Sequence, residues 1–300
     1  MSSVGRALRA CGMIRAMASA SESSAAVAPG AHDSARSTLF TILAELVHAD
    51  GRPVWTASLL HVLRAAGYTE QAARQAIARG SAAGWMVGER TGRQTRWSVA
   101  PALARAFDAG PERVFALSAG DGDWDGRWLV LFISVPQEQR TARKRLYGAL
   151  QWAGLGNPTP GLWLTPHTDR ADEVAAVIDE AGLRASAVSF VGSLAEIGLT
   201  EAEIVERAWD LDAVAASYAA LLARFGDLDP EPGDPLLLAQ LELSGAIRHV
   251  PFVDPQLPEA LLPGWIGRRA MRRLREVNAA WSPAAHARWR EIVDETSPGA

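Results

Sequence analysis

The chain has 300 residues, of which 48% are hydrophobic, and a formal net charge of −4, so it is long enough for two or three domains with buried cores. Its single cysteine, Cys11, excludes an internal disulfide and a cysteine-based zinc site, and it fits a cytoplasmic location. No run of 18 or more apolar residues occurs, which excludes a membrane-spanning helix on sequence grounds.

The charge is distributed unevenly along the chain. Residues 34–105 contain nine arginines and four acidic residues, whereas residues 106–300 contain 18 basic and 28 acidic residues. A basic module joined to an acidic body is typical of a protein that binds nucleic acid with one part and uses the rest for dimerisation and ligand binding. We therefore expect the DNA-contacting surface in the first third of the chain.

Two helices are predicted in the first part of this basic module. Hydrophobic residues recur at helical spacing across residues 34–51, and an Asp-Gly pair is expected to end that helix. A second helix is expected over residues 56–66, with Thr56 as its N-cap and Gly67 as its stop.

A third predicted helix is the candidate for base recognition. Its expected N-cap is Thr69, and Gly80 predicts an early end after Arg79. At 100° per residue, one face of this helix carries Arg and Gln side chains and the opposite face carries small apolar ones. Such forked or bidentate groups hydrogen-bond to guanine and adenine edges in a major groove. The predicted DNA-binding residues of this helix are Thr69, Gln71, Arg74, Gln75 and Arg79.

The segment GWMVGERTGRQTRWSVA, residues 84–100, predicts a hairpin around a Thr-Gly-Arg turn. Three helices followed by a hairpin, with a short glycine-containing turn between helices two and three, are typical of a winged helix-turn-helix. Arg90, Arg93 and Arg96 are then expected to lie along the phosphates or to enter the minor groove. The alternative interpretation is a solvated helix face with ordinary surface arginines.

The middle of the chain predicts strands that alternate with helices, as in a small α/β or ferredoxin-like unit. Strands are expected over residues 127–136, 161–167 and 185–194, and helices over residues 138–154 and 170–182. The segment GLGNPTPG, residues 154–161, begins like a dinucleotide loop. Because it follows a helix and precedes a strand, the reverse of the required order, it is predicted to be a turn.

From about residue 200 the pattern becomes helical. One or two helices are expected over residues 202–225, another over 235–249 and a last one over 262–281. The arginines of the last helix predict either a solvated face or a site for anionic groups. Trp152, Trp163 and Trp265 are candidate walls of an aromatic cavity, although tryptophans commonly fill cores. The candidate effector-binding residues are Trp152, Trp163, Arg268, Arg269 and Arg272.

Five unusual motifs occur in order along the chain. They are WDGRW at 124–128, W-x-G-x-G at 152–156, GLWLTP at 161–166, AWDLD at 208–212 and FVDPQLPEALLPGWIG at 252–267. Together with the N-terminal winged helix, they resemble the PaaX-type transcriptional repressors of phenylacetic acid degradation, over residues 34–280.

The resemblance implies an α+β fold with an N-terminal winged helix-turn-helix, a central Cas2-like ferredoxin-like α/β domain and a C-terminal helical domain. We place these domains at residues 34–110, 111–199 and 200–300, after a disordered tail over residues 1–33. The resemblance also implies a homodimer on a palindromic operator in double-stranded DNA, released by a small-molecule effector that is a coenzyme A thioester such as phenylacetyl-coenzyme A.

The function predicted from these observations is a DNA-binding repressor of an aromatic or acyl-coenzyme A catabolic operon. No enzyme activity, catalytic residue, metal site or cofactor is predicted, because the six histidines are scattered and no nucleophile motif occurs. One alternative is an activator on the same fold. The other is a Cas2-like metal-dependent nuclease, which would need a carboxylate at the end of the first central strand, where the sequence has Ser134-Val135-Pro136.

Overall fold

The computed structural model describes residues 34–109, 124–135, 140–195, 197–250 and 253–297. The predicted disordered tail lies outside the described residues. The chain has an α+β fold with two small antiparallel sheets. Within the described ranges, no helix is both long enough and apolar enough to cross a membrane.

The described residues group into two compact units, and each unit combines separated stretches of the chain. The terminal unit comprises residues 34–109, 219–248 and 270–297. The central unit comprises residues 124–218 and 249–269 with the gaps given above. Each unit therefore contains part of the C-terminal third of the chain.

The N-terminal part of the terminal unit consists of helices followed by a hairpin. Its elements are α2 (Ala35–Ile42), the π-helical η1 (Leu43–His48), β1 (Val54–Trp55), α3 (Thr56–Ala65), α4 (Glu70–Ala82), β2 (Met86–Thr91), β3 (Gln94–Val99) and α5 (Pro101–Ala109). The sheet order is β1-β3-β2. Thr91 pairs with Gln94 at the hairpin tip, and Gly92 there has a φ of +62°, which glycine adopts readily. The predicted hairpin is confirmed.

The two predicted helix caps have different outcomes. Thr69 is the N-cap of α4, as predicted, and its side chain accepts a hydrogen bond from the N–H of Ala72. The prediction for Thr56 is wrong, because Trp55 is the N-cap of α3. The Thr56 hydroxyl instead donates to the carbonyl of Thr95 at 3.2 Å, so it links the start of α3 to the hairpin.

Gly80 does not end α4, which continues to Ala82. It is buried where α4 meets its neighbours, and a Cβ at this position would lie 3.0 Å from Leu39 Cδ2 and 3.3 Å from Trp85. The predicted early end is therefore wrong for a physical reason: the missing side chain lets α4 pack closely on α2.

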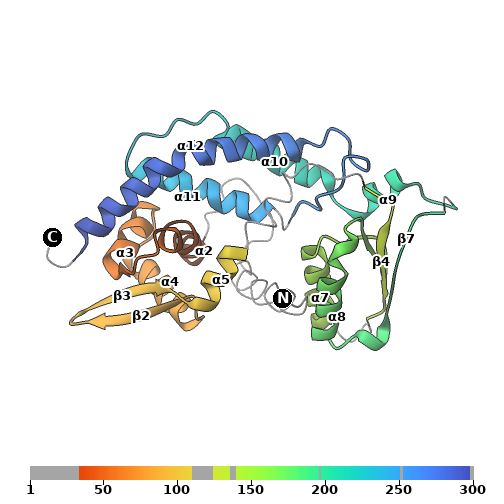
Figure 1. Ribbon diagram of the computed structural model, residues 1–300, viewed down its shortest axis with the longest axis horizontal. Helices are drawn as coiled ribbons and strands as arrows, with labels where there is room; N and C mark the ends of the chain where they lie inside the picture. The colour runs from red at the N-terminus through yellow and green to blue at the C-terminus, as the bar shows by residue number, and fades with distance from the viewer. Residues whose placement is uncertain (1–33, 110–123, 136–139, 196, 251–252, 298–300) are drawn as a thin grey trace. The chain divides into compact units, whose positions relative to one another are not determined.

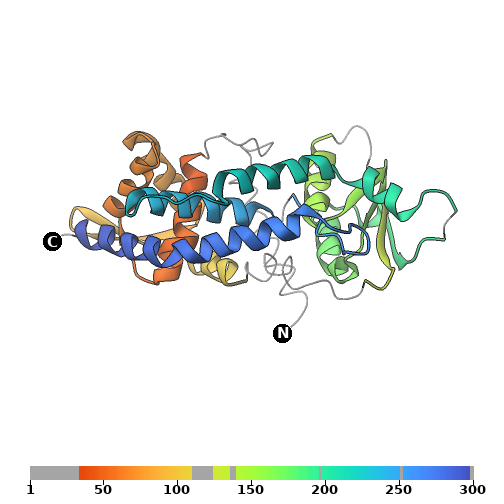
Figure 2. The ribbon, with the colours of Figure 1, turned by 90° about the horizontal axis from the view of Figure 1, so that it is seen from above.

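The core of the terminal unit continues from these elements into α11 (Asp234–His249) and α12 (Ile266–Glu295). Leu39, Leu63 and Trp289 are all 0% exposed and belong to one apolar cluster. Figures 1 and 2 both show α11 and α12 side by side. The α12 helix runs well beyond the predicted end at residue 281, despite Pro283 within it. The last turns of α12 thus belong to the same core as α3.

The central unit has the βαββαβ order of a ferredoxin-like arrangement. Its elements are β4 (Trp128–Ile133), α7 (Arg140–Trp152), β5 (Gly156–Thr159), β6 (Leu162–Thr165), η2 (Thr168–Arg170), α8 (Ala171–Glu180), η3 (Arg184–Ser186) and β7 (Ala187–Gly192). The antiparallel sheet has the order β5-β6-β4-β7, and Figure 1 shows α7 and α8 on one side of it. The turn predicted for residues 154–161 is wrong, because Gly156–Thr159 forms an edge strand paired with β6.

The second face of this sheet is covered in part by helix α9 (Glu201–Ala208) and the segment that follows residue 256. Trp128 and Leu164 from the sheet pack with Ile204 of α9 and with Leu257 and Leu261. A second helix, α10 (Leu211–Phe225), follows α9 after a break at Trp209 and Asp210. This part of the central unit contains the larger cavity described below.

Candidate nucleic-acid interface and ligand cavity

The α4 helix presents its polar face to solvent. Ala73, Ala76 and Ile77 are buried against the core, which fixes the rotation of the helix. The residues on the opposite side are all exposed: Thr69, Gln71, Arg74, Gln75 and Arg79. The four residues that helical periodicity assigned to one face are therefore accessible, and so is the cap residue Thr69. Their guanidinium and amide groups can form paired hydrogen bonds to base edges.

Arg74 has a partner within its own helix. Its Nη2 lies 2.8 Å from Glu70 Oε1, and both side chains are more than half exposed. An exposed pair at this spacing is worth only about 0.3–0.5 kcal/mol. A nucleic acid can therefore displace Glu70 at little cost, and until then the pair holds the Arg74 side chain along the exposed face.

The hairpin carries its exposed arginines at the tip. Arg90 and Arg93 flank Gly92 and are both exposed. The Nε of Arg90 donates to the Gly92 carbonyl at 3.2 Å. These two guanidinium groups are suited to phosphate contacts.

Arg96 differs from the other two hairpin arginines. It is half-buried, and its guanidinium lies 5.1 Å from the centre of the Trp55 ring, in the arrangement of a cation–π contact. Trp55 is its cross-strand partner in the β1–β3 pair. The structure thus brings Arg90 and Arg93 together at the tip and places Arg96 against the base of the hairpin.

Residues that sequence analysis did not select anchor the hairpin to α3. The Nε1 of Trp97 donates to the hydroxyl of Thr56 at 2.9 Å. Gly88 lies opposite Trp97, and a Cβ there would be 2.7 Å from the Trp97 ring. A glycine inside a predicted strand was the available signal, because it marks a site where another group approaches the backbone closely.

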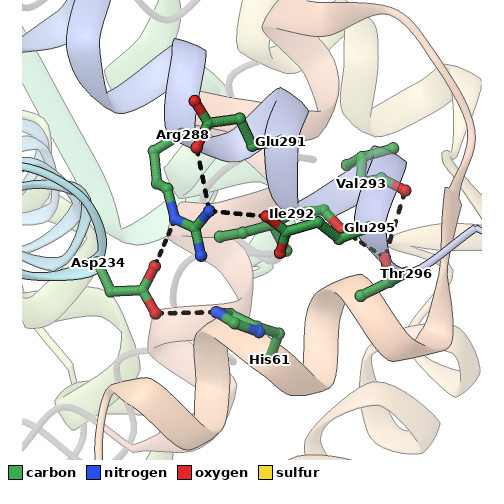
Figure 3. Close-up of polar contacts among 8 residues, drawn as sticks. All are labelled: His61, Asp234, Arg288, Glu291, Ile292, Val293, Glu295 and Thr296. Atoms are coloured by element: carbon green, nitrogen blue, oxygen red, sulfur yellow. Dashed lines mark hydrogen bonds and ion pairs between the residues drawn. The ribbon is translucent and has the colours of Figure 1, made fainter.

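A polar bridge connects α3 with α11 and α12 (Figure 3). Asp234 accepts from His61 Nε2 at 2.9 Å and from Arg288 Nε at 2.7 Å. Burial raises the pKa of Asp234, but the hydrogen bonds from Arg288 and His61 outweigh it and hold this pKa below its ordinary value. The charged carboxylate therefore joins a helix of the candidate DNA-binding surface to the C-terminal helices.

The candidate effector-binding residues lie in different local environments. Trp163 is 1% exposed and packs edge-on against Tyr147 in the sheet core, at a ring distance of 4.9 Å. Trp152 is half-buried at the end of α7. Arg268 is committed to the protein itself, since it donates to the carbonyls of Leu262 and Leu257 at 2.9 and 2.8 Å.

The two remaining candidates, Arg269 and Arg272, are exposed on α12. Arg269 belongs to the central unit and Arg272 to the terminal unit. Neither of the two cavities described next is lined by any of the five candidates.

The larger cavity, here called the α9 cavity, has a volume of about 770 Å³ and lies within the central unit. It is bounded by α9, the start of α10 and the segment that leads into α12. Its lining residues are Ala202, Val205, Glu206, Arg207, Ala208, Trp209, Asp210, Leu211, Asp212, Leu261, Leu262 and Trp265. Of the three tryptophans predicted as possible cavity walls, Trp265 lines this cavity and Trp152 and Trp163 do not.

A second cavity, of about 360 Å³, lies in the terminal unit beside Arg273 and Trp281. The Arg273 guanidinium is already bonded to the Gly226 carbonyl, with Asp227 and Glu276 both 3.6 Å away. These partners leave little capacity for a ligand anion at this position. No group of three or more His, Cys, Asp or Glu side chains suited to a metal ion occurs in the part of the chain that the structure describes.

Three family models match consecutive parts of the chain. They describe a PaaX-like protein over residues 34–102, the PaaX protein central Cas2-like domain over residues 121–205, and the PaaX-like protein C-terminal domain over residues 209–291. The first match contains α4 and the hairpin, and the second contains the ferredoxin-like sheet. The class defined by these matches is that of PaaX-like proteins with a Cas2-like centre.

A relative with a full description is the transcriptional repressor PaaX of Escherichia coli (strain K12). It is 30% identical over 251 residues, which covers 79% of this chain and 77% of that protein. The chain belongs to the PaaX family. Among solved structures, the uncharacterized protein Rv0674 from Mycobacterium tuberculosis matches with a TM-score of 0.58 and 20% identity, covering 86% of this chain and 98% of that chain. At this identity the likeness shows a shared fold alone.

Proposed function

We propose that the protein is a DNA-binding transcriptional repressor whose winged helix-turn-helix consists of α2 to α4 with the β2–β3 hairpin. The observation that carries the proposal is the exposed Arg and Gln face of α4 in the same small domain as the exposed hairpin arginines. In this function α4 enters the major groove and reads base edges, while Arg90 and Arg93 contact phosphates.

The supporting comparison is the relative from Escherichia coli, which is described as a transcriptional repressor. We propose that this chain acts as a cytoplasmic homodimer on a palindromic operator of an aromatic or acyl-coenzyme A catabolic operon, such as one for phenylacetic acid. Two winged domains would then lie about one helical turn apart on the duplex. An effector that favours a dimer of different spacing would release the DNA. The proposed effector is a coenzyme A thioester such as phenylacetyl-coenzyme A.

The domain boundaries belong to the same proposal: a DNA-binding domain at 34–110, a Cas2-like domain at 111–199 and a helical domain at 200–300. The Cas2-like centre also suggests a second candidate function, a metal-dependent nuclease. The β4 strand, WLVLFI, carries no carboxylate, and Ser134 and Val135 follow it. Binding therefore fits this central domain better than metal-assisted cleavage.

The test of the DNA-binding proposal compares two arginines with different roles. The operator is first obtained by selection from random duplexes, and binding to it and to a scrambled duplex is measured by fluorescence anisotropy at several salt concentrations. Arg74→Ala should weaken operator binding by about 1–3 kcal/mol and reduce discrimination against the scrambled duplex. Arg93→Ala should weaken binding to both duplexes about equally and lower the salt slope by about one.

The matched control is Arg184→Ala, which removes an exposed arginine of the central unit that pairs with the nearby Asp179. It should leave both affinities unchanged. Equal behaviour of the Arg74 and Arg93 variants would contradict their separate roles. Selection that enriches no sequence, together with unchanged binding in both variants, would refute the proposed interface.

A further inference from the structure

The α9 cavity is large enough for a ligand of drug-like size, since such pockets measure about 300–1,000 Å³ and this one measures about 770 Å³. The buried and half-buried residues of its lining are apolar, whereas most of the exposed ones are charged. The residues that provide this apolar lining are Val205, Ala208, Trp209, Leu211, Leu261, Leu262 and Trp265. An aromatic group buried among such side chains gains the free energy of removing its surface from water.

The two tryptophans contribute ring surface to the cavity and no solvent-accessible indole donor, although Trp209 Nε1 has no hydrogen-bond partner among the described residues. The indole N–H of Trp265 is already used, because it donates to Asp254 Oδ2 at 3.0 Å. The Nε1 atom of Trp209 is itself buried from solvent, in a residue that stacks on Trp128 at a ring distance of 6.5 Å. The walls therefore favour a flat apolar group over a ligand that requires indole hydrogen bonds.

The wall formed by Trp265 is held in place before any ligand arrives. Asp254 is only 4% exposed, and it accepts from Tyr218 Oη at 2.6 Å as well as from Trp265. The backbone N–H of Gln256 donates to its second oxygen at 2.7 Å. Gly267 packs directly against this hydrogen-bonded pair: a Cβ there would lie 2.5 Å from Trp265 Nε1 and 2.8 Å from Asp254 Oδ2. Such preorganisation reduces the cost of ordering a binding site.

The charged residues of the lining are mainly acidic. Glu206, Asp210 and Asp212 contribute three carboxylates, against the single guanidinium of Arg207, and all four residues are exposed. The Asp210 carboxylate lies at the start of α10, where it accepts a hydrogen bond from the Ala213 N–H at 3.1 Å. A net negative rim repels an anion and tolerates or attracts an uncharged or cationic group.

From the apolar walls, the fixed Trp265 and the acidic rim together, we infer that the α9 cavity binds the aromatic part of a small molecule and selects for a part that carries no negative charge. Where this ligand is the effector, the inference rests on the proposed function. A coenzyme A thioester would then enter with its uncharged aryl-acyl end, and its phosphates would remain outside the acidic rim.

The test uses three ligands of nearly equal shape and different charge: phenylacetate, phenylacetamide and 2-phenylethylamine. Binding to the full chain is measured by isothermal titration calorimetry and by quenching of tryptophan fluorescence. The amide and the amine should bind about three- to tenfold more tightly than the carboxylate at low salt. The double variant Glu206→Gln/Asp212→Asn should reduce this difference. Tighter binding of the carboxylate, or no binding of any of the three, would overturn the inference.

The location is tested with a matched pair of variants. Ala202→Trp places an indole in the cavity lining, whereas Ala216→Trp adds the same side chain at an exposed position of α10 outside the lining. The first should lower affinity for the amide and for phenylacetyl-coenzyme A at least tenfold, and the second should leave both unchanged. Equal affinities in the two variants would show that the cavity is not the site.

DNA binding is measured on the same variants, so that the two proposals fail separately. Ala202→Trp should bind the operator like the unmodified chain but resist release by phenylacetyl-coenzyme A. Loss of ligand binding with normal operator binding leaves the repressor proposal intact. A ligand site without any sequence-specific DNA binding would leave the cavity inference intact and refute the repressor.

Discussion

The exposed arginines of α4 and the hairpin tip and two arginines of the central unit, Arg170 and Arg268, use the same side chain in opposite ways. Arg74, Arg79 and Arg93 are exposed, and the partner found for Arg74 is an exposed glutamate of its own helix. In the central unit, Arg170 donates to the Ala153 carbonyl at 3.0 Å, and Arg268 donates to two further carbonyls. A guanidinium bonded to backbone carbonyls stabilises a fold, whereas an exposed one remains available for another molecule.

The difference shows what sequence composition cannot tell about a cluster of arginines. The last helix contains five arginines within eight residues, the densest cluster in the chain, and it attracted an anion-site hypothesis. In the structure, Arg268 holds the segment around Leu257 and Leu262, and Arg273 holds the Gly226 carbonyl. The looser group on α4 and the hairpin tip has the exposure that a nucleic-acid surface needs.

The largest expected effect comes from replacing an arginine that is hydrogen-bonded to backbone carbonyls. Arg268→Met should lower the free energy of unfolding by about 3 kcal/mol, because two carbonyls and Glu259 lose a charged donor. The adjacent Arg269→Met, at an exposed position, should change it by less than about 0.5 kcal/mol. Urea denaturation followed by tryptophan fluorescence measures both. Similar losses in the two variants would remove the distinction between the two classes of arginine.

A smaller effect is expected from His167, which lies near the same segment. Burial and, to a lesser extent, the positive charge of Arg170 together lower the pKa of His167 to about 4, and a hydrogen bond to the Pro255 carbonyl opposes the change. Between the ordinary pKa of about 6.5 and this value, the unfolded chain binds a proton that the folded chain does not. The contribution of His167 to stability should therefore fall by roughly 2 kcal/mol from pH 7 to pH 5.

The check on this pH effect is the variant His167→Asn, studied by urea denaturation at both pH values. It should lose less stability than the unmodified chain as the pH is lowered. The variant Arg170→Met removes the nearby positive charge, so it should move the midpoint of the pH effect upward. Identical pH dependence in all three proteins would show that His167 titrates normally.

The elements that the sequence predicted well are those fixed by local pattern. The α4 helix follows from its amphipathic spacing and its cap at Thr69, and the hairpin follows from alternation around Gly92. The strand β5 was missed because Gly156-Asn157-Pro158-Thr159 has poor strand propensity. It becomes a strand because it pairs with β6, and because Gly156 lets Trp209 pack where a Cβ would lie only 2.5 Å away.

The two candidate sites also differ in whether local sequence pattern could predict them. The exposed face of α4 could be predicted because a helix repeats within a few residues, and its buried alanines fix which side faces solvent. The α9 cavity could not, because its walls come from residues 202–212 and 261–265, which meet only in the folded unit. Trp265 was selected as an aromatic wall, but its hydrogen bond to Asp254 depends on tertiary structure.

Arg288 is intermediate between the carbonyl-bound and the exposed arginines, because it is bonded to the side chain of Asp234 on a neighbouring helix. Asp234→Asn should destabilise the terminal unit by about 1–2 kcal/mol, since it weakens the hydrogen bonds from Arg288 and His61. Because the pKa of Asp234 is lowered in the folded chain, its stabilising contribution is present above the ordinary pKa and is lost as the pH falls through the folded value. A double-mutant cycle with Arg288→Met measures the coupling. A coupling near zero would mean that the bridge in Figure 3 is not energetically significant.

The smallest expected effect concerns an exposed arginine, Arg74, and its partner Glu70. Glu70→Gln removes the partner of Arg74 and a favourable acidic residue from the first turn of α4, so stability should fall by about 0.5 kcal/mol or less. Operator binding should instead become about two- to fivefold tighter, because Arg74 is released and a carboxylate that would face the phosphates is removed. Weaker operator binding, at unchanged stability, would mean that Glu70 positions Arg74 in the complex and does not compete with DNA for it. The same substitution in an Arg74→Ala background separates the two effects, since only the removal of charge remains there.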